Sequence, residues 1–131
     1  MFLETSAIVE YIAEEPRANE MADRLSATTS PLVTAPTVLF EAAVVLSRKR
    51  KCSVAETKTL LLDFLEAMDV SVIPITPEIG FAAIDAFARY GKGRGHPAQL
   101  NFGDCFSYAA CKAAHVPMLF VGDDFTKTDL A

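Results

Sequence analysis

Short apolar runs alternate with helical patterns along the 131-residue chain, and this alternation is what most restricts its fold. The apolar runs are MFL, LVTA, VSVIPI and VPMLFVG. The segments between them carry apolar residues at helical spacing. Strands that alternate with helices form parallel sheets joined by right-handed crossovers. We therefore expect an α/β fold, with a central parallel sheet of four to five short strands and helices on both faces.

Capping residues and prolines divide the helical part of the chain. Ser6, Ser53 and Asn101 are suited to cap helices, and prolines begin three others. We expect helices over residues 7–15, 16–28, 36–50, 54–68, 77–90 and 102–114. In the fifth of these we expect the inward residues to be Ile79, Ala83, Ile84 and Phe87. No repeat or linker divides the sequence, so residues 1–131 are predicted to form a single domain.

Composition excludes several classes of protein. No apolar run approaches the roughly 20 residues of a membrane span, and no basic region precedes an apolar N-terminus. We expect a cytoplasmic protein that has no membrane contact. The cysteines, Cys52, Cys105 and Cys111, form no CxxC pair and are interpreted as reduced structural thiols. A formal net charge of −5 argues against binding nucleic acid by broad neutralisation of phosphates.

Basic residues are nevertheless clustered in two places. Residues 48–51 read RKRK, which we interpret as the solvated C-terminus of a helix, where cations suit the helix dipole. Lys92, Arg94 and His96 share a second segment, which is rich in glycine. The glycines predict a loop there.

Acidic residues occupy unusual positions at four places in the chain. Glu4 ends the first expected strand, and Asp123 and Asp124 follow the last one. In an open α/β sheet the functional crevice lies beyond the carboxyl ends of the strands, so these acids are expected at the same edge. Glu41 interrupts the apolar stretch VLFEAAVVL, and Asp104 lies among apolar residues near a helix start. A carboxylate among apolar neighbours is costly unless it is paired or binds a cation.

Each acid also has an ordinary structural interpretation. Glu4 can end a strand, Asp104 can cap its helix by reaching the amide of Asn101, and the acids near residue 124 can form a turn. Glu41 can pair with Arg48. No cluster of histidines or cysteines competes as a metal site. Carboxylates without such ligands suit hard cations such as Mg²⁺ or Mn²⁺.

Four blocks of the sequence resemble the PIN-domain toxins of the VapC type. They are ETSA near the start, FEAAVVLSRK, GKGRGHPAQLNFGDCFSYA and LFVGDDFTKTDL. The resemblance spans nearly the whole chain and keeps the order and spacing of the blocks. It implies a PIN-like domain with metal-dependent endoribonuclease activity, which acts as the toxin of a bacterial toxin–antitoxin module. The implied cofactor is Mg²⁺ or Mn²⁺, and the implied partners are RNA, a VapB-type antitoxin and a second copy in a homodimer.

The resemblance also assigns roles to individual residues. It places the acidic quartet at Glu4, Glu41, Asp104 and Asp124. Glu4, Asp104 and Asp124 are the expected metal ligands, Glu41 is expected to orient water, and Ser6 supports the first acid. A carboxylate-held cation would lower the pKa of bound water and clamp the phosphate.

Further residues are expected to support this site. Lys92 and Arg94 are predicted to hold flanking phosphates, and Asn101 to support the helix that carries Asp104. Asp123 competes with Asp124 as the fourth acid, and we choose Asp124 because it matches the family's aspartate before phenylalanine. The apolar residues of the first four helices are expected to carry the protein–protein contacts.

Two departures from the family pattern leave alternatives open. The family ordinarily has aspartate where this chain has Glu4, and the GKGRGHPA segment looks one glycine longer than usual. A catalytically weakened member that acts mainly by binding its antitoxin is therefore one alternative. A phosphatase that forms a phospho-aspartate is another, but it needs an aspartate at the end of the first strand.

Overall fold

Four short strands form one sheet in the order β3-β2-β1-β4, and all three pairings are parallel. The computed structural model describes all residues from Met1 to Ala131. The strands are β1 (Phe2–Leu3), β2 (Leu32–Thr34), β3 (Val70–Val72) and β4 (Met118–Leu119). Phe2 pairs with Val33 on one side and with Met118 on the other, so β1 lies inside the sheet. The predicted parallel α/β architecture is confirmed.

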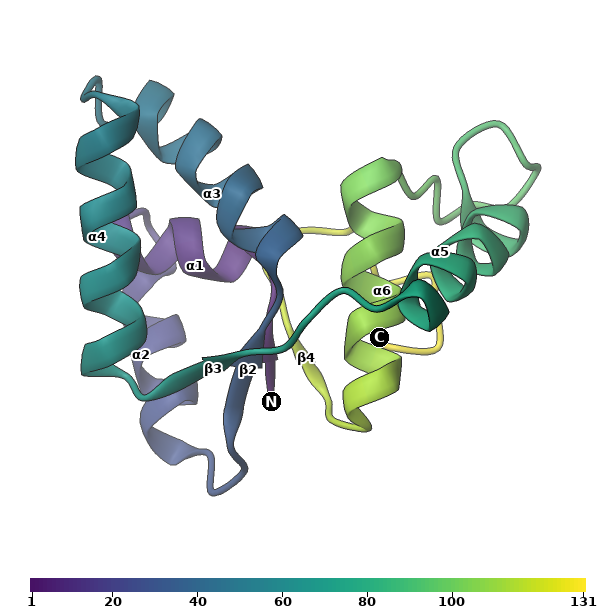
Figure 1. Cartoon of the computed structure of the whole chain (residues 1–131), viewed down its shortest axis with the longest axis horizontal. Helices are drawn as coiled ribbons and strands as arrows, with labels where there is room; N and C mark the ends of the chain where they lie inside the picture. The colour runs from purple at the N-terminus through teal and green to yellow at the C-terminus, as the bar shows by residue number, and fades with distance from the viewer.

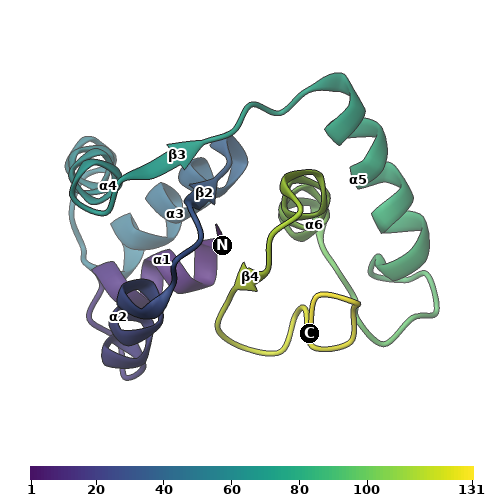
Figure 2. The ribbon, with the colours of Figure 1, turned by 90° about the horizontal axis from the view of Figure 1, so that it is seen from below.

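Six helices cover the two faces of this sheet. They are α1 (Thr5–Ile12), α2 (Ala18–Ala27), α3 (Pro36–Lys49), α4 (Val54–Ala67), α5 (Pro77–Tyr90) and α6 (Phe102–Ala114). Helices α1 to α4 lie on one side, and α5 and α6 lie on the other (Figures 1 and 2). No helix combines the length and the apolar character that crossing a membrane would require.

The core lies where the apolar faces of the helices meet the sheet. Phe2 and Leu3 are buried in β1, and α3 buries Val38, Ala42 and Leu46 at helical spacing. Burying a side chain of this size contributes about 1.5–3 kcal/mol relative to leaving it exposed. The strands are short, so most of the buried apolar surface comes from the helices.

Several expected boundaries were wrong, and the run VPMLFVG is a strand only over Met118–Leu119. Helix α1 begins at Thr5 with Glu4 as its N-cap, because the Glu4 carboxylate accepts the backbone N–H of Ser6. Helix α2 begins at Ala18 rather than at Pro16. The run VSVIPI is a strand only over Val70–Val72. One further N–H, that of Ile73, bonds to β2, and Pro74 then has no donor to continue the pairing.

The expectation that four residues of α5 face inward was also wrong for two of them. Ile79 and Ala83 are buried, whereas Ile84 is 63% exposed and Phe87 is 43% exposed. The helical spacing identified an apolar stripe that is wider than the surface α6 covers. The apolar side chains at its edge are left facing solvent.

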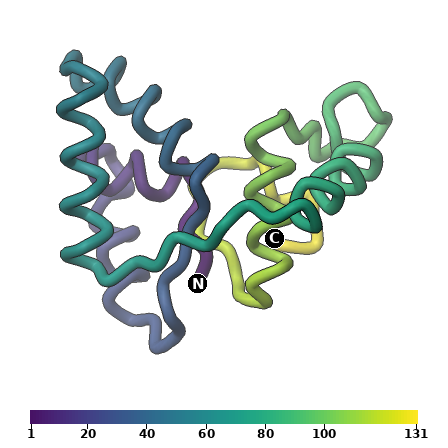
Figure 3. Tube along the Cα trace, in the orientation of Figure 1, coloured from purple at the N-terminus to yellow at the C-terminus, as the bar shows by residue number.

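The chain reverses its direction of travel across the sheet between β1 and β4. It passes from β1 to β2 and β3 through the helices of one face, then returns through α5 and α6 to place β4 beside β1 (Figure 3). The crevice of such a sheet lies at this reversal, beyond the carboxyl ends of the strands. The ends of β1 and β4 therefore mark where a functional site is expected.

Candidate functional site

The end of β1 is joined directly to the end of β4. The backbone N–H of Glu4 donates to the carbonyl of Leu119 at 3.1 Å. The Ser6 hydroxyl adds a second link, because it accepts the N–H of Val121 at 2.9 Å and donates to Glu4 Oε2 at 2.6 Å. Ser6 thus fixes the first acid relative to the segment that carries Asp124.

Glu4 is buried and held in one orientation. Its Oε2 accepts two hydrogen bonds from Ser6, the backbone N–H at 2.7 Å and the hydroxyl at 2.6 Å. Burial raises the pKa of the Glu4 carboxyl, and the nearby charge of Glu41 adds to the rise, while the Ser6 hydrogen bonds oppose it. Both hydrogen bonds from Ser6 go to Oε2, which leaves Oε1 as the oxygen that could bind a ligand.

Glu41 reaches the same region from α3. Its Oε1 accepts the hydroxyl of Thr5 at 2.7 Å, and the structure contains no ion pair between Glu41 and Arg48. On the other side it lies against Gly103, where an added Cβ would be 2.7 Å from Oε2. Gly103 therefore provides the space that Glu41 occupies.

Asp104 has both a structural and a site-facing oxygen. Its Oδ2 accepts the N–H of Asn101 at 3.1 Å, and Asn101 Oδ1 accepts the N–H of Asp104 at 2.9 Å. This capping box confirms the ordinary structural interpretation of Asp104 and positions Asn101. Asp104 Oδ1 accepts no hydrogen bond from the protein and remains available.

The acids are close enough to affect one another's ionisation. Burial raises the pKa of Asp104 to about 7, and the charges of Asp124, Glu4 and Glu41 contribute, while the Asn101 N–H opposes the rise. Holding these carboxylates ionised and close together at neutral pH therefore costs free energy. A bound cation would relieve that cost.

A cavity of about 310 Å³ connects these residues. Its lining contains the four acids Glu4, Glu41, Asp104 and Asp124, together with Ser6 and Asn101. Asp123 is exposed and does not line it, and neither Lys92 nor Arg94 does. The structure thus brings the acidic quartet together but leaves the predicted phosphate-binding loop outside the cavity.

Four residues that line the cavity or support its acids were not predicted from the sequence. Thr5 and Gly103 contact Glu41, while Glu10 and Lys49 line the cavity. Lys49 follows Glu41 by eight residues on α3, and the intervening Val45 also lines the cavity. Spacing of four residues places side chains on one helix face, so this signal was present in the sequence.

The donor set fits a hard divalent cation in its chemistry. It offers only oxygen ligands and a concentration of negative charge, which Mg²⁺ and Mn²⁺ prefer. No three acidic, histidine or cysteine side chains are gathered closely enough to form a ready-made ligand set. The free oxygens of Glu4 and Asp104 would have to turn toward a bound ion.

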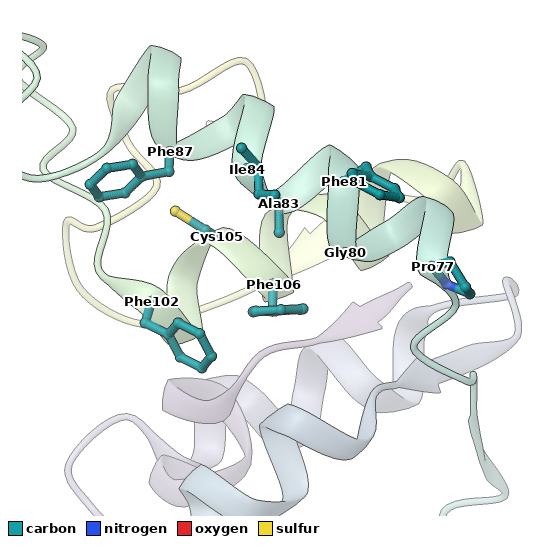
Figure 4. Close-up of a pocket in the computed structure, with 9 residues that line it drawn as sticks. All are labelled: Pro77, Gly80, Phe81, Ala83, Ile84, Phe87, Phe102, Cys105 and Phe106. Atoms are coloured by element: carbon teal, nitrogen blue, oxygen red, sulfur yellow. The ribbon is translucent and has the colours of Figure 1, made fainter.

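A second hollow, of about 620 Å³, lies between α5 and α6 and has a different character. Its lining has no charged residue, and side chains of both helices surround it (Figure 4). Phe81 and Ile84 come from α5, and Phe102 and Phe106 come from α6. The rings of Phe102 and Phe106 pack in a tilted arrangement, with centroids 5.0 Å apart and 57° between their planes. Such a surface suits an apolar partner and offers no groups for catalysis.

The chain is similar to known proteins over nearly its whole length. The PIN domain family model matches residues 1–130. The chain is 40% identical to a VapC ribonuclease of Rhizobium meliloti, with 98% of each chain covered. It is 43% identical to ribonuclease VapC36 of Mycobacterium tuberculosis, over 99% of this chain and 91% of the relative.

A solved structure shares the fold. The crystal structure of VapC20 of Mycobacterium tuberculosis, described as a toxin that cleaves the sarcin-ricin loop, superposes with a TM-score of 0.77. It is 18% identical and covers 95% of this chain and 92% of its own. The sequence relatives and the family model show that this chain, with its acidic cavity beyond the ends of β1 and β4, belongs to the PIN domain family and, within it, to the VapC ribonucleases.

Proposed function

We propose that the protein is a metal-dependent endoribonuclease that acts in the cytoplasm as the toxin of a toxin–antitoxin module. The observation that carries this proposal is the convergence of Glu4, Glu41, Asp104 and Asp124 on one cavity at the ends of β1 and β4. The VapC relatives named above support RNA as the substrate. A VapB-type antitoxin is the proposed protein partner.

The residues take distinct roles in this proposal. Glu4, Asp104 and Asp124 would hold Mg²⁺ or Mn²⁺, which when bound polarises the phosphate and makes a bound water more acidic. Glu41, whose carboxylate accepts the Thr5 hydroxyl, would accept a proton from the attacking water. Ser6 and Asn101 position the acids by hydrogen bonds and do not react. Phosphodiester hydrolysis then adds water across one P–O bond.

Removing the metal is expected to abolish cleavage. We expect bacterial total RNA to be cut by the purified protein in Mn²⁺ or Mg²⁺, and to remain intact in EDTA until the ion is restored. The ion should also raise the melting temperature, because it binds the folded state. Equal cleavage in EDTA, or no shift in melting temperature at millimolar metal, would contradict the metal-dependent mechanism.

We further propose that a second copy of the chain packs against the hollow between α5 and α6. The same surface contains an uncharged hollow and protruding apolar side chains, which is what self-complementary two-fold packing needs. Glu78 lies near one end of α5 and Arg89 near the other. Antiparallel packing of two α5 helices would bring these opposite charges together. Apolar side chains are also exposed on α3 and α4, where the contacts were expected.

The dimer prediction is tested by introducing one charged residue on each candidate surface. Ile84→Asp on α5 should convert a dimer to a monomer in sedimentation velocity, because it buries a carboxylate in the interface. Leu62→Asp on α4 is the matched control, since Leu62 is 56% exposed and Ile84 is 63% exposed. A monomeric wild type, or a dimer disrupted only by Leu62→Asp, would overturn the proposed surface.

A further inference from the structure

Lys49 differs from the other cations at the end of α3. It is the only basic residue that lines the acidic cavity, whereas Arg48 and Lys51 are exposed outside it. The neighbouring Arg50 is engaged elsewhere, because it donates to the carbonyl of Ile12 at 3.0 Å. A solvated helix end accounts for the cluster as a whole but not for the place of Lys49.

Lys49 lies at a fixed distance from Glu41, because both residues are on α3. It follows Glu41 by eight residues on the same helix, which is about 12 Å along the axis at 1.5 Å per residue. This separation is large enough that one RNA strand could place its scissile phosphate at the acids and a flanking phosphate at Lys49.

In the free protein Lys49 forms an ion pair that a ligand can replace. Its ammonium donates to Glu15 Oε1 at 2.9 Å, and the Lys49 side chain is 47% exposed. Exposed ion pairs of this kind contribute little to stability. A phosphate oxygen can replace the Glu15 carboxylate at little cost, and its charge-assisted hydrogen bond to the ammonium is strong.

We propose that Lys49 binds a phosphate of the RNA strand that flanks the scissile one, and that Glu15 competes for Lys49 in the free protein. This inference rests on the proposed function, because the strand is placed by its scissile phosphate at the acidic quartet. The predicted phosphate contacts of Lys92 and Arg94 lie outside the cavity and are separate from this one.

Binding measured without cleavage tests this proposal. The probe is a fluorescein-labelled pool of random single-stranded RNA, followed by anisotropy over a range of KCl concentrations in the Asp104→Asn background. Lys49→Ala should weaken binding roughly 5- to 10-fold. It should also reduce the slope of log K against log salt by about 0.7, the value for one contact to a single strand. Lys49→Arg should restore both quantities.

The chain offers a matched control in Lys112. Its ammonium pairs with Asp129 at 3.0 Å and its side chain is 49% exposed, but it lies outside the acidic cavity. Lys112→Ala should leave the affinity and the salt slope unchanged. Glu15→Gln should tighten binding about 2-fold, because it removes the competing carboxylate, and should have no effect when Lys49 is alanine.

The outcomes separate this inference from the proposed function. Equal effects of Lys49→Ala and Lys112→Ala on affinity and salt slope would overturn the phosphate site, even if the wild type cleaves RNA. If Lys49→Ala weakens binding as expected but the wild type cleaves no RNA in Mn²⁺, the phosphate site stands and the nuclease proposal fails.

Discussion

Replacing Asp104 by asparagine is expected to lower the rate of RNA cleavage by at least about 100-fold while preserving the fold. The substitution removes one carboxylate from the proposed metal site, and even partners of metal ligands typically contribute 10- to 100-fold. The amide oxygen of asparagine can still accept the N–H of Asn101, so the helix cap is retained. Initial rates on bacterial RNA in Mn²⁺ measure the loss.

The same variant should change how stability depends on pH. Because the pKa of Asp104 is raised to about 7 in the folded protein, its contribution to stability is present at low pH and is lost as the pH rises through 7. Metal-free wild type should therefore lose on the order of a few kcal/mol between acidic and mildly alkaline pH. The loss should be smaller for Asp104→Asn, with the remainder due to Glu4, whose pKa is also raised.

Two measurements on Asp104→Asn distinguish a site residue from a capping residue. Denaturant unfolding in EDTA above pH 7 should find the variant at least as stable as the wild type, since a desolvated charge has been removed. Added Mn²⁺ should then stabilise the wild type far more than the variant. A variant that is strongly destabilised in EDTA, with unchanged metal response, would assign Asp104 to the helix cap alone.

Replacing Glu4 by aspartate is expected to raise the cleavage rate, by up to about 100-fold in Mg²⁺. Glutamate carries its carboxylate one methylene further from the backbone, and a displacement of roughly 1 Å can cost on the order of 100-fold in rate. Mg²⁺ demands near-ideal octahedral geometry, so we expect the wild type to prefer Mn²⁺ and the gain to be larger in Mg²⁺.

The contacts of Glu4 explain why this substitution should be tolerated. Glu4 caps α1 by accepting the N–H of Ser6, and aspartate is among the preferred N-cap residues. Glu4→Ala is the control for loss of the carboxylate and should abolish cleavage. The test is cleavage of one RNA by all three proteins in each metal. Equal or lower activity for Glu4→Asp would contradict the hypothesis that the Glu4 carboxylate is displaced from the best position for the metal. A slow wild type would favour the alternative of a weakened toxin that acts mainly by binding its antitoxin.

The sequence alone was sufficient for the architecture, because its signals are local. Alternating strand and helix patterns imply a parallel sheet, and parallel strands end at the same edge. That rule brought Glu4 to the edge that carries Asp124 without any knowledge of packing. Glu41 and Asp104 were identified as anomalous by their apolar neighbours, but their place beside Glu4 came from the family resemblance.

Tertiary packing decided which side chains face the site and which face solvent. Periodicity marks an apolar stripe on a helix but not the width that a neighbour covers, so Ile84 was expected inside and lies exposed. Charge in the sequence marked the glycine-rich loop, yet Lys49 is the cation that lines the cavity, because α3 packs with the face that carries Glu41 toward α1 and α6. Side-chain surroundings depend on contacts between segments far apart in the chain, and no local pattern contains them.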